Sequence, residues 1–304
     1  MASRVSNLVS RAWTKGLFDG TVVFCTGGNG TICSAQVKAL VYLGADACII
    51  GRNVEKTLKM AEDISRARPH SRVLGIGNVD VRNSERLNAA VEECVAKLGA
   101  IDFVMQGLST NAFKSVVDID LLGSYNTVKA TMPHLLASAN RAKSTGLPSG
   151  GRIIFISATF HYTGMPYQAH VASAKAGVDA LSASVALECG PRGVTSNVIS
   201  PGGVEGTEGL QRLSSQASRE SGQGCRQIPL GRYGSLREIA DATVFLFGET
   251  GSYVTGHVLV VDGGAWRLAG LVGQSAGMTY PEAVLGEQAL PEDIETGRRP
   301  KPHL

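Results

Sequence analysis

Short apolar stretches rich in β-branched residues alternate along the chain with longer stretches whose apolar residues recur at helical spacing. The short stretches predict β-strands at residues 21–26, 47–50, 73–76, 101–105, 152–157, 194–200 and 258–261. The longer stretches predict helices at residues 31–43, 54–67, 84–98, 111–138, 169–189 and 235–248. Strands that alternate with helices form right-handed parallel βαβ units. We therefore expect an α/β fold, a doubly wound parallel sheet (Rossmann fold) in a single domain.

The alternating pattern also sets the expected domain limits. Residues 19–268 contain all of it and form the expected folded domain. Residues 1–18 form a basic leader without acidic residues, which fits either a segment that packs on the core or a weak mitochondrial presequence. Residues 269–304 form a tail rich in Gly, Pro and charge, to which no fold is assigned. Ser84 is the candidate N-cap of its helix, and residues 140–151 predict a polar surface loop.

Composition excludes several classes of protein. The formal net charge is only +3 and no block of like charges occurs, which argues against a nucleic-acid partner. Apolar residues make up 43% of the chain, enough to bury a core, so the chain is not intrinsically disordered. No apolar run approaches the roughly 20 residues of a membrane span. The six cysteines lack zinc-site spacing, so we expect free thiols and no metal.

A glycine-rich turn joins the first predicted strand to the first predicted helix. Its glycines allow a tight turn and bring backbone N–H groups and the helix N-terminus close to a pyrophosphate. The turn predicts a dinucleotide site, although a glycine cluster alone fits any tight strand–helix turn. The residues expected to bind the cofactor here are Gly27, Gly28, Asn29, Gly30, Thr31 and Ile32.

The end of the second predicted strand indicates which nicotinamide cofactor is bound. Arg52 stands there without a nearby acid, which suits the 2′-phosphate of NADP(H) better than the free ribose hydroxyl of NAD. The alternative for Arg52 is a solvated loop arginine. After the third strand, Asp80 and Val81 stand where a carboxylate can meet an adenine amino group, and the alternative for Asp80 is a turn cap.

From these motifs, residues 18–266 resemble the short-chain dehydrogenase/reductase family. The family normally works with a Ser, a Tyr and a Lys four residues after the Tyr. Lys175 is present, but Val171 stands in place of the tyrosine and Ala158 in place of the serine. No residue at those two positions can protonate an alkoxide, so an ordinary carbonyl reductase is not expected.

One branch of the family lacks the same two groups, the peroxisomal 2,4-dienoyl-CoA reductases with their fungal sporulation-linked forms. The chain resembles this branch in several strings. They are Asn111-Ala112-Phe113-Lys114, Asp118-Ile119-Asp120, Ile156-Ser157-Ala158-Thr159, Gly206-Thr207-Glu208-Gly209-Leu210 and Asp262-Gly263-Gly264-Ala265-Trp266. The resemblance implies NADPH-dependent reduction of a 2,4-dienoyl-CoA to a 3-enoyl-CoA in β-oxidation of unsaturated fatty acids.

The resemblance also implies residue roles. Asp120 and Lys175 would be catalytic, acting together to orient a water that donates a proton, with Lys175 also holding the nicotinamide ribose. The alternative for Asp120 is a purely structural partner of Lys175. Further cofactor contacts would come from Pro201, Gly202, Val204 and Thr207. Acyl-CoA contacts would come from Arg82, Ser109, Asn111 and Arg212. A homo-oligomer in the peroxisome is expected, with mitochondrion or cytoplasm as alternatives.

The chain departs from this branch after the fourth predicted strand, where the connection to the next helix is shorter by about eleven residues, which is sterically allowed. The alternatives are a variant with impaired activity or a mis-joined gene model. Two rival functions follow: a non-catalytic NADP-binding protein, or a general NADP-dependent reductase in which Tyr162 or Tyr167 replaces the missing acid.

Overall fold

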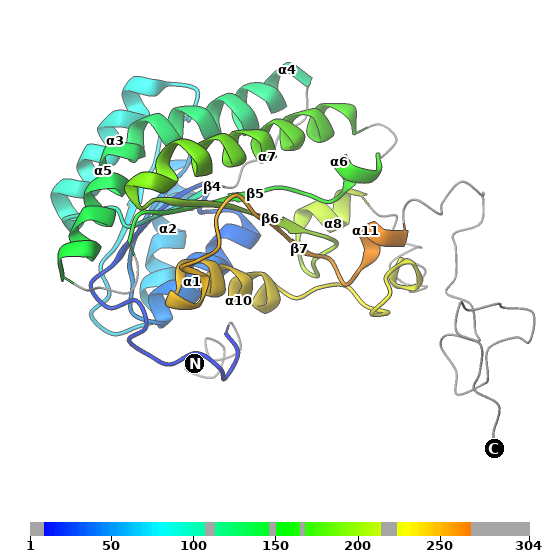
Figure 1. Cartoon of the computed structure of the whole chain (residues 1–304), viewed down its shortest axis with the longest axis horizontal. Helices are drawn as coiled ribbons and strands as arrows, with labels where there is room; N and C mark the ends of the chain where they lie inside the picture. Colours follow the sequence, from blue (N-terminus) through cyan, green and yellow to red (C-terminus); the bar gives the residue numbers. More distant parts are fainter. Residues whose placement is uncertain (1–8, 107–112, 146–149, 165–167, 214–223, 269–304) are drawn as a thin grey trace, which may run out of the picture.

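One parallel sheet runs through the molecule (Figure 1). The computed structural model describes residues 9–106, 113–145, 150–164, 168–213 and 224–268. The sheet has seven strands in the order β3-β2-β1-β4-β5-β6-β7, and all neighbours are parallel. The strands are β1 (Val22–Thr26), β2 (Asp46–Ile50), β3 (Val73–Ile76), β4 (Phe103–Gln106), β5 (Arg152–Ile156), β6 (Thr195–Pro201) and β7 (Val258–Val261). The predicted fold class is confirmed.

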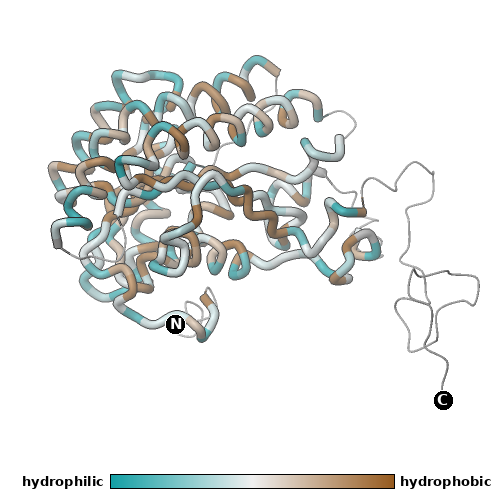
Figure 2. Tube along the Cα trace, viewed as in Figure 1, coloured by the Kyte–Doolittle hydropathy of each residue, from teal (hydrophilic) through white to brown (hydrophobic). Residues whose placement is uncertain are grey.

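Helices cover both faces of the sheet (Figure 1). One face carries α1 (Thr31–Tyr42), α2 (Val54–Ser65) and α10 (Leu236–Phe247). The other carries α3 (Ser84–Leu98), α5 (Gly123–Thr145) and α7 (Ala169–Cys189). Figure 2 shows apolar positions along the central strands, and the polar positions lie mainly toward the outside of the helices. Because both faces are covered, strands such as β1 read as continuous apolar runs and not as an alternation.

Two hydrophobic cores result, one on each face. On the α1 and α10 face, Phe103 lies between Phe18 and Phe247, with ring centroids 5.6 Å and 4.7 Å away. Trp13 packs against this core, and its indole N–H donates to Asp241 at 2.8 Å. Residues from the N-terminal side of β1 therefore pack on the domain.

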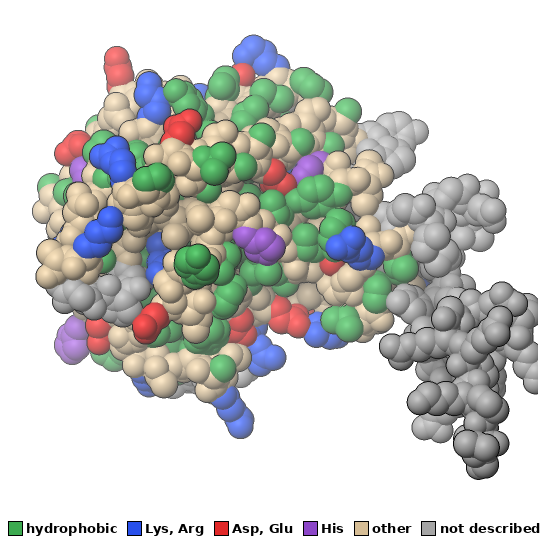
Figure 3. Space-filling model, in the orientation of Figure 1, with side chains coloured by type: hydrophobic (Ala, Val, Ile, Leu, Met, Phe, Trp, Pro, Cys, Tyr) green, Lys and Arg blue, Asp and Glu red, His purple; other side chains and the backbone are tan. Residues whose placement is uncertain are grey.

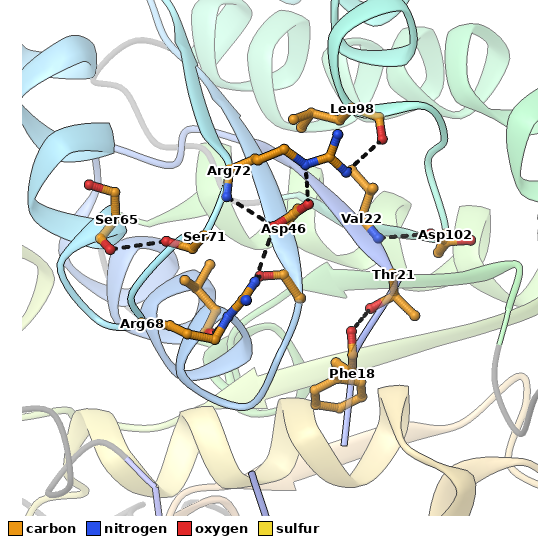
Figure 4. A network of polar contacts seen from close by, with 12 residues as sticks. Phe18, Thr21, Val22, Asp46, Ser65, Arg68, Ser71, Arg72, Leu98 and Asp102 are labelled. Carbon is orange, nitrogen blue, oxygen red and sulfur yellow. Dashed lines mark hydrogen bonds and ion pairs between the residues drawn. The ribbon is translucent and has the colours of Figure 1, made fainter. Parts of the chain in front are cut away.

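The amino ends of the strands are closed by an ionic network (Figure 4). Asp46, the first residue of β2, accepts hydrogen bonds from Arg68 at 3.1 Å and from Arg72 at 2.6 Å. Asp102, just before β4, accepts the backbone N–H of Val22 at 2.7 Å. These contacts fix the strand starts and leave the carboxyl ends of the strands available for a site.

Short elements follow the strands at the carboxyl edge. After β4 come α4 (Phe113–Val116) and a π-helical turn, η2 (Val117–Leu122). After β5, β6 and β7 come α6 (Phe160–Thr163), α8 (Glu208–Leu213) and α11 (Ala265–Leu268). The 3₁₀ turns are η3 (Gly190–Arg192), η4 (Cys225–Gln227) and η5 (Glu249–Gly251).

Three local predictions differ from the structure. The helix predicted at 111–138 is instead α4, η2 and α5, and α5 continues through Thr145, so the loop predicted from residue 140 is wrong for its first six residues. The last turns of α5 are polar yet helical because Ser138 and Arg141 both bind Asp102. The N-cap of α3 is Asn83, not Ser84.

The structure also bears on the cysteines, on membrane spans and on surface charge. All six thiols are free. No helix in the described part of the chain is long and apolar enough to cross a bilayer. On the face drawn in Figure 3, Lys and Arg side chains are interspersed with Asp and Glu, and no block of one sign stands out.

The cap assignment can be tested by mutation. The Asn83 side chain accepts the backbone N–H of Arg86 at 3.0 Å, whereas the structure gives Ser84 no such bond. We expect Asn83→Ala to lower the free energy of unfolding by about 1 kcal/mol. Ser84→Ala is the matched control and should change it by much less. Urea denaturation measures both, and equal losses would contradict the assignment.

Candidate active site

Buried polar atoms without partners gather at the carboxyl edge of the sheet. Thr26 ends β1, Gln106 ends β4, Ser157 follows β5 and Ser200 lies near the end of β6. The side-chain polar atoms of Thr26 and Gln106 are buried and have no hydrogen-bond partner among the described residues. Ser157 and Ser200 are buried too, and they lie close enough to Asp179 and Tyr162 to lower the pKa values of those two residues. Leaving such a group unpaired costs about 1–3 kcal/mol, so this edge is suited to a polar ligand.

The glycine-rich turn lies at this edge, between β1 and α1. Gly27 has φ +64°, a conformation that glycine adopts without strain. A Cβ on Gly28 would lie 2.6 Å from Cβ of Ile49, so the turn packs directly on β2. Gly30 precedes Thr31 and Ile32 and gives α1 no side-chain cap, which leaves the N–H groups of the first turn free for a phosphate.

The end of β2 lies beside this turn. The Asn29 amide donates to Thr57 Oγ at 3.2 Å, which ties the turn to α2. Arg52 is exposed and forms no hydrogen bond or ion pair with the described residues. Its guanidinium is therefore available to an anion.

Asp80 and Arg82 were expected to meet different ligands, but the structure pairs them with each other. Nη2 of Arg82 lies 2.6 Å from Oδ2 of Asp80. This hydrogen bond lowers the pKa of Asp80. The loop is held to α5 because Asn126 donates to the carbonyl of Val81 at 3.0 Å.

The two predicted catalytic residues lie together. Asp120, on η2, has a carboxylate oxygen 3.1 Å from Nζ of Lys175, on α7. Nζ also donates to the carbonyl of Ile156, the last residue of β5, at 2.9 Å. Since an ammonium has three donors, one N–H of Lys175 is left for a ligand.

The π-helical turn explains why Asp120 points inward. Asp118 lies on the outside and pairs with Lys114 at 2.5 Å, whereas Asp120 is only 2% exposed. A π turn is a wider winding that recurs at functional sites. Burial raises the pKa of Asp120, and the nearby Lys175 ammonium opposes the shift. Asp120 therefore holds a proton more readily than a surface aspartate.

A second acidic residue, Asp179, was not predicted. It lies one helical turn after Lys175 on α7, a spacing that the sequence could have revealed. Asp179 Oδ2 lies 2.9 Å from Nε2 of His161 and accepts the hydroxyl of Tyr162 at 2.7 Å. Burial and Asp179 raise the pKa of Tyr162 above its usual range. Tyr162 is thus a poor replacement for the missing tyrosine.

The segment after β6 closes the other side of the edge. A Cβ on Gly202, next to Pro201, would lie 2.6 Å from Cβ of Asp262. Val204 is buried, and the hydroxyl of Thr207 donates to its carbonyl at 2.7 Å. The hydroxyl predicted to meet the cofactor is therefore engaged within its own loop.

Three predicted substrate residues have no described side chain. Ser109 and Asn111 lie outside the described residues, as do the shortened connection and Tyr167. Arg212 belongs to α8, but only the backbone is described there. No group of His, Cys, Asp or Glu in the described ranges is arranged to hold a metal ion.

The geometry fits a nicotinamide dinucleotide. The first turn of α1 offers free N–H groups, the switch in strand order lies between β1 and β4, and Lys175 keeps a donor. A family model described as enoyl-(acyl carrier protein) reductase matches residues 28–265. The chain belongs to the short-chain dehydrogenase/reductase family. Within this family, the Ala158 and Val171 positions mark it as a member without the usual serine and tyrosine.

Curated relatives resemble this chain over most of its length. The chain is 49% identical over 286 residues to the peroxisomal 2,4-dienoyl-CoA reductase [(3E)-enoyl-CoA-producing] of Saccharomyces cerevisiae, covering 90% of this chain and 92% of that protein. It is 36% identical to the Danio rerio protein of the same name, covering 88% and 91%. A short-chain type dehydrogenase/reductase from Mycobacterium ulcerans has the same fold, with TM-score 0.73, 23% identity and 84% and 94% coverage.

The tight packing of the nucleotide turn gives a test. Gly28→Ala places a methyl group against Ile49 and must move the turn, so we expect NADPH affinity to fall at least about tenfold. Gly190→Ala is the control, because a Cβ there meets no atom within 4 Å. Nucleotide fluorescence measures affinity and thermal melting checks the fold. Unchanged affinity in Gly28→Ala would contradict this placement of the cofactor.

Proposed function

We propose that the protein is an NADPH-dependent 2,4-dienoyl-CoA reductase that forms a 3-enoyl-CoA in β-oxidation of unsaturated fatty acids. The observation that carries the proposal is the buried Asp120–Lys175 pair beside a strand end that lacks the family serine and tyrosine. The relatives that share most of the chain bear this activity in their names.

The chemistry explains why the two groups are dispensable. Bound NADPH supplies a hydride, which the dienoyl thioester accepts at its δ-carbon. Negative charge then develops on the thioester oxygen, and protonation at the α-carbon completes the reaction. No alkoxide forms, so no phenol is needed to protonate one.

Lys175 and Asp120 supply what the reaction does need. The free N–H and positive charge of Lys175 stabilise nearby negative charge, and this effect is strong because the site is buried. Asp120, whose pKa is raised by burial, is suited to hold a proton and to orient the water that delivers it.

Arg52 favours NADPH over NADH. Arg52 is exposed at the end of β2, where the family binds the adenine ribose. It forms no hydrogen bond or ion pair with the described residues, although its charge helps to lower the pKa of Asp80. The acyl-CoA would contact Arg82, Ser109, Asn111 and Arg212. Arg82 would then release Asp80 and bind a phosphate of the CoA. Each of these contacts remains a proposal.

Assembly and location are also proposed. Leu122, Tyr125 and Leu187 are exposed on η2, α5 and α7, which supports a homo-oligomer formed through this face. The peroxisome is the proposed compartment because the relatives are named peroxisomal.

Two other functions have less support. A general carbonyl reductase would need Tyr162 or Tyr167 as its acid. Tyr167 lies outside the described residues, and the Tyr162 hydroxyl already donates to Asp179, with burial and Asp179 raising its pKa. A non-catalytic NADP-binding protein would have no use for a buried Asp120–Lys175 pair, whose burial costs free energy.

The catalytic pair is tested by Lys175→Met and Asp120→Asn. We expect each to lower kcat for a 2,4-dienoyl-CoA by about 10²–10⁴, the usual share of general acid–base catalysis. Loss of NADPH absorbance measures turnover, and circular dichroism checks folding. Lys114→Met, which breaks the surface pair with Asp118, is the control and should be near wild type. NADPH binding without turnover in the unmodified protein would favour the non-catalytic alternative.

Cofactor choice is tested by Arg52→Gln. Removing a charge-assisted phosphate contact should weaken NADPH binding by about ten- to a hundredfold and leave NADH binding nearly unchanged. Fluorescence titration with both nucleotides measures the ratio. Equal losses for the two nucleotides would show that Arg52 does not bind the 2′-phosphate.

A further inference from the structure

Four ionisable side chains form a row on and beside α7. Asp120 contacts Lys175, Asp179 follows Lys175 by one helical turn, and His161 contacts Asp179. The side chains of Asp120, Lys175, Asp179 and His161 are 1%, 10%, 14% and 6% exposed, respectively. Charges this poorly solvated act on one another strongly.

The contacts of His161 fix its charge. Nδ1 lies 2.5 Å from the carbonyl oxygen of Ala158, and Nε2 lies 2.9 Å from Oδ2 of Asp179. A carbonyl only accepts, and Asp179 Oδ2 already accepts the Tyr162 hydroxyl. With Asp179 ionised, both ring nitrogens face acceptors only, and this geometry assigns a hydrogen to each of them, which makes His161 an imidazolium.

The state of Asp179 agrees with this assignment. Burial alone would raise the pKa of Asp179, but hydrogen bonds from His161 and Tyr162 outweigh it and place the pKa below its usual range. Asp179 is thus an anion, and the pair is ionic.

Within the described ranges, few other charged side chains lie near His161. Its helix α6 packs on α7 and α11. From α7, the charged groups are Asp179 and Lys175. From α11, Arg267 lies 3.9 Å over the Trp266 ring, which is 5.6 Å from Tyr162. Arg267 is exposed, so water screens it.

The charge balance follows. With His161 protonated and Asp120 ionised in its pair with Lys175, the four charges cancel. With His161 neutral, the group carries one net negative charge beside the place where the reaction develops another. We propose that His161 is a positioning residue. Its imidazolium neutralises Asp179, so that Asp179 does not offset the charge of the Lys175 ammonium, and this charge stabilises the anionic transition state. This inference rests on the proposed function.

The main experiment separates charge from shape. His161→Gln keeps a side-chain donor to Asp179 but removes the charge. We expect kcat for a 2,4-dienoyl-CoA to fall about ten- to a hundredfold, with NADPH affinity changed by less than about threefold. Adding Asp179→Asn restores neutrality and should recover most of the loss. The control is His134→Gln, from the surface pair with Glu92 at 3.7 Å, which should have no effect.

Two results would overturn the proposal. Wild-type activity in His161→Gln would show that the charge is not needed. A double variant no more active than the single one, with melting temperatures alike, would show that the pair acts only by shape.

A measurement independent of turnover keeps the two proposals apart. Ring ¹⁵N NMR shifts of the whole protein should show hydrogen on both ring nitrogens of His161, and on only one of them in Asp179→Asn. A neutral ring in an active wild-type enzyme would refute this inference alone. An imidazolium in a protein without turnover would refute the proposed function and leave the ion pair standing.

Discussion

The buried contact between Asp120 and Lys175 is the interaction on which the site depends. It joins a π-helical turn after β4 to the long helix after β5, and the last carbonyl of β5 supplies the second partner of the ammonium. Burying two charges costs several kcal/mol per ion unless geometry and hydrogen bonds compensate. The adjacent order of β4 and β5 in the sheet provides that geometry.

The two ends of the sheet have different roles. At the amino ends, Asp46 and Asp102 have their oxygens satisfied by arginines, a serine and backbone N–H groups. At the carboxyl ends, the side chains of Thr26 and Gln106 have no hydrogen-bond partner in the part of the chain that the structure describes. The contacts at the amino ends stabilise the fold. At the carboxyl ends, a polar ligand that bonds to the unpaired groups would remove the free-energy cost of burying them.

The other residues of the site are consistent with the loss of the family serine and tyrosine. A reaction that places its proton on carbon needs a balanced electrostatic environment more than a phenol. The backbone carbonyl of Ala158, at the position of the missing serine, binds His161, and His161 binds Asp179. The segment after β5 thus bears an ion pair in place of a hydroxyl pair.

The sequence by itself determined the order of strands and helices, the glycine-rich turn and the position of Arg52 at the end of the second strand. These features are local: periodicity, glycines and short motifs report on neighbours in the chain. It also named Lys175 and Asp120 as candidate catalytic residues, but only through the family resemblance. The tertiary structure alone decided that Asp120 turns inward while Asp118 faces solvent, that Asp80 binds Arg82, that α5 continues to Thr145, and that His161 meets Asp179. Each of these contacts joins groups that are brought together only when the chain folds. The distances between the groups are set by helical winding and by the order of strands in the sheet, and no local sequence pattern encodes either.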